Sequence, residues 1–218
     1  MPSLKNILRE IRKELREKEK VRENAQKDMR KATSLSKQAI LLSHQKRLKD
    51  AKKLIEKATE IISKLNDTSA NYPYIVYSGL FSAALQEYSE ANIFLKLIEE
   101  SKFVTPKEIN VPSVDYVLGL ADVVGEYRRM SLDALREGDV GKSEKCLEMM
   151  DEIYIELMAM DEAYMLVPGL RRKCDTARKI IEATRGDVTQ EIRRSMLEKY
   201  LKRFEKLAKR RQARKFVE

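Results

Sequence analysis

The chain has 218 residues, of which 43% are hydrophobic and 36% charged, and it carries a net charge of +9. This length and apolar content suit a single domain with a buried core, which we place at 1–218, and exclude a disordered chain. One His and two Cys exclude a multi-histidine metal site, a cysteine zinc site and a disulfide framework.

Helical periodicity dominates the sequence, and no segment has the alternation of a strand. Between Ser3 and Asn71 there is no Gly or Pro, and apolar residues recur at three- and four-residue steps. We therefore predict an all-α bundle of seven helices. In chain order they span about residues 3–45, 48–66, 74–100, 114–137, 139–164, 170–184 and 188–214.

Turn-forming residues set these boundaries. Asn66 to Ser69 reads as a loop by composition, and Pro106 and Pro112 mark a connector at 101–113. Ser113 is suited to cap the fourth helix, and Asp139 or Ser143 the fifth. Pro168-Gly169 and Arg185-Gly186-Asp187 predict the last two breaks.

Charge is distributed unevenly along the chain. Residues 1–31 and 191–218 carry net charges of +5 and +7, whereas residues 87–170 carry −10. Basic segments can contact phosphates, and metal-dependent nuclease chemistry requires concentrated acidic groups. For most of these residues, however, a solvated helix face is the simpler interpretation. The charged N-terminus does not resemble a signal peptide, and no apolar run could span a membrane, so we expect a cytoplasmic protein.

Two carboxylates fall on the apolar side of the predicted third helix. With Glu87 at zero on a helical wheel, Ala84, Ala91 and Phe94 lie within about 60°, and Glu90 lies about 60° to the other side. Two carboxylates on one buried face repel each other unless a cation lies between them. A divalent ion would satisfy both, and ion pairs with arginines are the alternative.

The predicted fourth helix is amphipathic and carries a charged stripe on its solvent side. Asp122 and Glu126 lie one turn apart on this stripe, together with Asp115, Arg129 and Asp133. Alone, such residues are more often solvated than catalytic. Gly119 and Gly125 flank the stripe, where their lack of a side chain can admit another helix or a ligand. If the two helices pack antiparallel, their acidic pairs could converge and bind Mg²⁺, or alternatively Mn²⁺.

Three segments resemble the translin/Trax family, and Trax (translin-associated factor X) most closely. The segment from Leu85 to Ala91, LQEYSEA, is similar to the LQEYVEA type of Trax, and the segment from Val114 to Glu126 to the family's VDYLLGVADLTGE type. The segment from Ser34 to His44 resembles the first helix of Trax, and Arg185-Gly186 the family's turn after the sixth helix.

This resemblance implies the translin-type fold and a hollow octamer that encloses RNA. Trax is the catalytic type of subunit in the complex that degrades the passenger strand during silencing-complex activation. The catalytic and metal-binding positions of Trax correspond to Glu87, Glu90, Asp122 and Glu126, which we call the acidic set. We therefore expect a Mg²⁺-dependent endoribonuclease acting on single-stranded RNA, with single-stranded DNA and short duplex RNA as further ligands. The alternatives are a non-catalytic, translin-like binding oligomer and a structural scaffold. The connector at 101–113 is shorter than in animal Trax, which favours assembly from one kind of subunit.

An RNA-enclosing oligomer needs basic side chains on its interior. The candidates in this sequence are Lys37, Lys46, Arg128, Arg129, Arg193 and Arg194. Arg129 ranks first because it shares a wheel face with Asp122 and Glu126, where it could hold a phosphate or pair with the carboxylates. No Gly-rich phosphate loop or aromatic RNA-binding signature is found in the sequence, so recognition should be mainly electrostatic.

Overall fold

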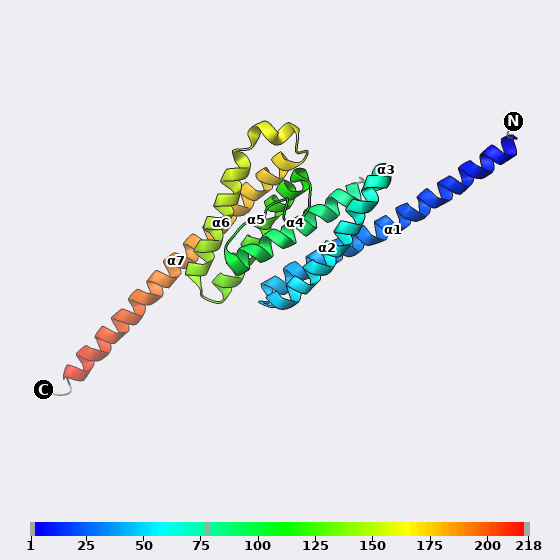
Figure 1. Ribbon diagram of the computed structural model, residues 1–218. Coiled ribbons are helices and arrows are strands. Elements are labelled where there is room, and N and C mark those ends of the chain that lie inside the picture. The colour runs from blue at the N-terminus through cyan, green and yellow to red at the C-terminus, as the bar shows by residue number, and fades with distance from the viewer. Residues whose placement is uncertain (1–2, 77–78, 216–218) are drawn as a thin grey trace. The chain divides into compact units, whose positions relative to one another are not determined.

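The computed structural model describes residues 3–76 and 79–215, and every regular element in them is helical, as predicted (Figure 1). The elements are α1 (Leu4–His44), α2 (Leu48–Asn71), α3 (Pro73–Val76), α4 (Gly79–Glu100), α5 (Ser113–Arg136), α6 (Val140–Met158), the 3-10 turn η1 (Asp161–Met165) and α7 (Leu170–Lys215). None of the described helices is long and apolar enough to cross a membrane.

The chain forms two compact units, which we treat separately. Unit 1 comprises Met1–Val123 and Met160–Lys173, and unit 2 comprises Val124–Ala159 and Cys174–Glu218. Helices α5 and α7 each contribute residues to both units. Of the acidic set, Glu87, Glu90 and Asp122 therefore belong to unit 1 and Glu126 to unit 2.

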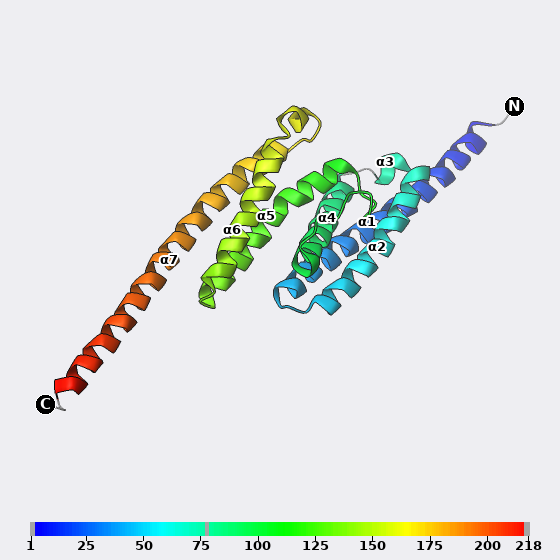
Figure 2. The same ribbon diagram turned by 60° about the vertical axis from the view of Figure 1, so that its left-hand side comes forward.

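In unit 1, α1 packs along α2 and α4 (Figure 2). Ala25, Ala32 and Ala39 recur every seven residues on α1 and are buried, so the neighbouring helices can approach closely. Helix α4 is largely buried, and its Tyr88 hydroxyl shares a 2.7 Å hydrogen bond with Thr59 of α2. Burial raises the pKa of Tyr88. Helix α4 is thus the central element of unit 1.

The predicted loop at 66–69 is wrong, because α2 continues to Asn71. Loop-forming side chains here bond to the helix's own backbone: Thr68 donates to the Lys64 carbonyl at 2.8 Å and Ser69 to the Asn66 carbonyl at 2.6 Å. Leu65 and Ser69 are also buried. The predicted third helix corresponds to α3 and α4, and the junction at 77–78 lies outside the described residues.

In unit 2, α6 and α7 lie side by side (Figure 2). Their buried residues include Met150 and Ile153 of α6 and Ile181 of α7. Asp139 caps α6, as predicted, by accepting a 2.9 Å hydrogen bond from the Lys142 backbone.

The break predicted at 185–187 is wrong, because α7 is continuous from Leu170 to Lys215. A glycine inside a helix costs about 1 kcal/mol, which packing on both sides of Gly186 can offset. Thr184 and Val188 are both buried, and Arg185 binds Asp151 of α6 at 2.8 Å. The glycine signal was therefore outweighed by tertiary contacts.

Candidate functional site

Helices α4 and α5 meet closely at Gly119. A Cβ atom at this position would lie 2.6 Å from the Gln86 carbonyl oxygen, 2.8 Å from the Ser89 Cβ and 3.0 Å from the Glu90 nitrogen. Only glycine fits at such distances, so the predicted close approach at Gly119 is confirmed. A Cβ at Gly125 would meet no atom of the described residues within 4 Å, so no described helix approaches closely there, and the approach of a ligand stays a prediction.

The acidic pair of α4 lies on the inner side of the helix, as the wheel predicts. Glu90 is only 8% exposed, and the Glu87 side chain is 26% exposed. Ser89 lies on the side of α4 opposite Glu87 and is also fully buried, because Gly119 of α5 packs against it. The Ser89 hydroxyl donates to the Leu85 carbonyl at 2.7 Å, which satisfies it within the helix.

A lysine from α1 pairs with Glu87. The Lys37 Nζ lies 3.1 Å from the Glu87 Oε1, and the Lys37 side chain is 62% exposed. Lys37, a predicted RNA contact, therefore reaches a carboxylate of the acidic set.

A second lysine pairs with Asp122 of α5. The Lys173 ammonium donates a short hydrogen bond to the Asp122 carboxylate, and both side chains are partly exposed. Lys173 was not among the residues predicted for the site. In the sequence, Lys173 stands out only as part of the basic segment that follows Pro168-Gly169. Its pairing with Asp122 could not be predicted, because spacing within one helix does not reveal a partner on another helix.

Asp115 departs from the expected solvent stripe of α5. Its carboxyl group is buried and accepts a 2.5 Å hydrogen bond from the Ser82 hydroxyl of α4. Burial raises the pKa of Asp115, an effect that hydrogen bonds from Ser82 and Gln86 oppose. The wheel placed this residue in water because it did not include the packing of α5 on α4.

The carboxylates suit a hard cation by their chemistry. Among the described residues, no three His, Cys, Asp or Glu side chains gather closely enough to form a metal cage. Mg²⁺, however, usually takes only one or two protein carboxylates and completes its shell with water and substrate phosphate. Glu87 and Asp122 are partly exposed, and each already holds a cationic group. At Glu87, the ion pair expected as the alternative to metal binding is therefore made by a lysine in place of an arginine, and Asp122 is paired with a lysine in the same way.

In unit 2, the two adjacent arginines of α5 have different environments. Arg128 donates to the Thr184 hydroxyl at 2.7 Å and the Ile180 carbonyl at 3.3 Å, and lies 3.7 Å from Asp187. Arg129 is exposed and makes no hydrogen bond or ion pair within the described residues. Arg128 therefore ties α5 to α7, whereas Arg129 can receive a phosphate.

The other predicted basic contacts are exposed. Lys46 lies between α1 and α2 with a φ of 61°. On α7, Arg193 is exposed, and Arg194 lies 3.7 Å from Glu191 and 3.5 Å from Glu198. Glu126, the fourth member of the acidic set, is half-buried on α5, one turn after Asp122.

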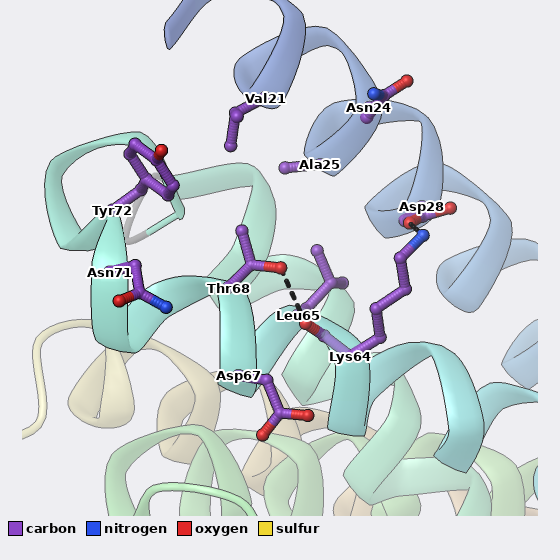
Figure 3. Close-up of a pocket in the computed structure, with 10 residues that line it drawn as sticks. All are labelled: Val21, Asn24, Ala25, Asp28, Lys64, Leu65, Asp67, Thr68, Asn71 and Tyr72. Carbon is purple, nitrogen blue, oxygen red and sulfur yellow. Dashed lines mark hydrogen bonds and ion pairs between the residues drawn. The ribbon is translucent and has the colours of Figure 1, made fainter. Parts of the chain in front are cut away.

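A separate cavity of about 430 Å³ lies between α1 and α2 (Figure 3). Asp28 of α1 and Lys64 of α2 form a 2.7 Å ion pair at its wall. Thr68 and Asn71 contribute polar groups to the lining. No member of the acidic set lines this cavity. The Asp28–Lys64 ion pair is therefore a suitable control for the two lysine pairs of the acidic set.

Comparison with solved structures gives close matches in fold. A crystal structure of AfC3PO is 36% identical, with a TM-score of 0.76 over 84% of this chain and 96% of that one. A complex of AfC3PO with duplex RNA gives 36% identity and a TM-score of 0.75, over 84% and 95% of the two chains. Apo-NeC3PO, at 24% identity and a TM-score of 0.79 over 88% and 100%, shares the fold.

Sequence comparison assigns the family. Uncharacterized protein MJ0175 of Methanocaldococcus jannaschii is 37% identical over 141 residues, which is 64% of this chain. The match spans 62% of that relative's length. The model of the Translin family matches residues 4–184, which contain the whole acidic set. The chain therefore belongs to the Translin family.

Proposed function

We propose that the protein is a Trax-type, metal-dependent endoribonuclease that acts on single-stranded RNA within a homo-oligomer. The observation that carries the proposal is that two carboxylates, those of Glu87 and Asp122, are partly exposed on α4 and α5. They lie on helices whose backbones approach at Gly119. The arrangement offers oxygen ligands on two rigid elements.

RNA as the ligand is supported by the neighbouring structure of AfC3PO with duplex RNA and by the net charge of +9. The exposed side chains of Lys46, Arg129 and Arg193 can contact phosphates. Binding of this kind releases counterions, so affinity should fall steeply as the salt concentration rises. Single-stranded DNA and short duplex RNA are the further ligands to test.

The acidic set would divide the chemistry as follows. Glu87 and Asp122 would hold Mg²⁺ or Mn²⁺, and Glu90 and Glu126 are the other proposed ligands. Either Glu90 or Glu126 would accept a proton from the attacking water. When bound, the ion lowers the pKa of that water and stabilises the charge that develops on the phosphate. Arg129 orients the phosphate through its guanidinium group.

Self-association is supported by apolar residues that the single chain leaves in solvent. On α7 they recur at three- and four-residue steps and are 52–72% exposed: Met196, Leu197, Tyr200, Leu201, Phe204 and Leu207. Helix α1 exposes Leu4, Leu8, Ile11 and Leu15 in the same manner. Such stripes are typical of helices that pack against another chain. We propose an octamer, located in the cytoplasm.

A non-catalytic RNA-binding oligomer is the second candidate. It is favoured by the lysine partners of Glu87 and Asp122, which already neutralise these carboxylates. In that case the acidic set would stabilise the fold and RNA would bind without being cut.

Cleavage of a labelled single-stranded RNA separates the two candidates. The nuclease cuts with Mg²⁺, and both EDTA and the substitution Glu126→Ala abolish the reaction while the oligomer stays intact. Tight, salt-sensitive binding without cleavage in Mg²⁺ or Mn²⁺ would establish the second candidate instead.

A further inference from the structure

Both lysines that pair with the acidic set come from other elements than their partners. Lys37 reaches from α1 to Glu87 of α4, and Lys173 reaches from the first turn of α7 to Asp122 of α5. Neither pair is a local contact between residues one helical turn apart. The fold therefore brings one ammonium group to each of these two carboxylates.

Both ion pairs are exposed enough for another cation to displace the lysine from the carboxylate. The side chains of Glu87 and Asp122 are 26% and 38% exposed, and that of Lys37 is 62% exposed. An ion pair in contact with water contributes little to stability, because solvent screens the attraction. A divalent ion, with twice the charge of an ammonium group, can therefore compete for the same oxygen atoms.

We propose that Lys37 and Lys173 are built-in counter-cations that compete with the divalent ion for Glu87 and Asp122 and then turn to the phosphate of the RNA. The proposal rests on the proposed nuclease function and adds a role for residues outside the acidic set. Before the ion binds, the lysines offset the repulsion between ionised carboxylates. After it binds, each flexible lysine carries an unpaired ammonium group beside the substrate.

The exchange follows from charge balance. A phosphodiester brings a negative charge toward a site that is itself acidic, and the ion neutralises only part of the total. An ammonium group released from Glu87 or Asp122 supplies further positive charge without any change in the backbone. Lys173 suits this role because its aspartate partner lies on α5, one turn after the close approach of α4 and α5 at Gly119.

Binding of Mn²⁺ alone, followed by the electron paramagnetic resonance signal of the free ion, tests the competition directly. Lys37→Met and Lys173→Met keep most of the side-chain volume and remove the charge. Each should tighten Mn²⁺ binding by about threefold to tenfold, since one positive charge close to the ion is lost. The matched control is Lys64→Met, which removes the lysine of another inter-helix pair, with Asp28, and should leave Mn²⁺ binding unchanged.

A second readout locates the effect. Adding Glu87→Gln to Lys37→Met should cancel the gain in Mn²⁺ affinity, and Asp122→Asn should do the same for Lys173→Met. RNA cleavage at saturating Mn²⁺ should fall in both lysine variants, although they bind the ion more tightly. Lys37→Gln and Lys173→Gln serve if a methionine variant fails to form the native oligomer.

The outcomes separate this inference from the proposed function. Unchanged or weaker Mn²⁺ binding in both lysine variants, in a protein that cuts RNA, overturns the inference and leaves the nuclease standing. A wild type that neither binds Mn²⁺ nor cuts RNA, with lysine variants that gain Mn²⁺ binding, supports the inference and refutes the nuclease. If no variant binds Mn²⁺, both fail.

Discussion

Gly119 of α5 lies directly against the backbone of Glu90 of α4, since a Cβ atom at position 119 would be 3.0 Å from the Glu90 nitrogen. The backbone of one residue of the acidic set is thus held where the two helices touch. Asp122, another member, follows on α5 three residues later. The spacing of the two helices therefore controls the geometry available to the acidic residues of unit 1.

Gly119→Ala should push α5 away from α4, because the added methyl group would lie 2.6 Å from the Gln86 carbonyl oxygen. We expect a loss of about 1–3 kcal/mol in the free energy of unfolding, measured with urea, and a marked loss of RNA cleavage. Gly125→Ala, on the same helix but with no described atom within 4 Å of the new Cβ, is the control. It should be neutral or stabilising by up to about 1 kcal/mol. Equal effects of the two changes would refute this role for Gly119.

Arg128→Met and Arg129→Met should separate stability from RNA binding. Arg128 donates to Thr184 and Ile180 of α7, so its loss should lower the free energy of unfolding by about 1–3 kcal/mol. Arg129 has no partner within the described residues, so its loss should leave stability within about 0.5 kcal/mol. Fluorescence anisotropy should show weaker RNA binding and a shallower salt dependence for Arg129→Met. Unchanged RNA affinity would remove Arg129 from the proposed site.

Asp115→Asn should change how stability depends on pH. Burial raises the pKa of Asp115 in the folded chain, so the unfolded chain loses this proton at a lower pH than the folded chain does. Within that range the folded state binds more protons, and the group's contribution to stability falls as the pH rises. Urea unfolding from about pH 3 to 7 should therefore show the variant gaining stability relative to the wild type as the pH increases. A constant difference across this range would contradict the prediction.

Cys146 should be unreactive in the folded protein. Its side chain is buried, and burial raises the pKa of the thiol to about 11, so almost no thiolate exists at neutral pH. Cys174 is also buried. A colorimetric disulfide reagent should therefore modify both thiols rapidly in urea and only very slowly in native buffer. Rapid native labelling of Cys146 would show that α6 opens readily.

Leu197→Glu and Leu201→Glu should disrupt self-association, because each places a charge in the exposed apolar stripe of α7. Light scattering after size-exclusion chromatography should report a smaller assembly with unchanged helicity. Lys199→Glu, an exposed neighbour of the stripe, introduces the same side chain and should leave the assembly intact. An unchanged mass for both leucine variants would exclude this stripe from the interface.

Helical periodicity predicted the all-α class and the inward position of Glu87 and Glu90, because apolar spacing reports which face of a helix is buried. Turn-forming residues were less reliable. Gly186 and Asn66 lie inside helices, since packing on either side outweighs their weak local preferences. Asp115 was assigned to the solvent side because a helical wheel does not show which second helix covers a polar side chain.

The candidate site was predictable only in part. The acidic set came from local patterns and from the resemblance to Trax, and its assignment to metal binding stays a prediction. The contact of Lys173 with Asp122 could not be predicted from the sequence, since the two residues are 51 positions apart in the chain. Arg128 contacts α7, which no spacing within α5 could indicate, and its role in RNA binding stays a prediction.

The most direct test is the rate of single-stranded RNA cleavage in Mg²⁺ by the wild type, Asp122→Asn and Asp133→Asn. Asp122 belongs to the acidic set, whereas Asp133 lies on the same helix and pairs at 3.1 Å with Arg136, a residue one turn away. The account predicts that Asp122→Asn loses cleavage by about a hundredfold or more with RNA binding retained, while Asp133→Asn matches the wild type. Cleavage that survives Asp122→Asn unchanged, or that is absent from the wild type, would contradict it.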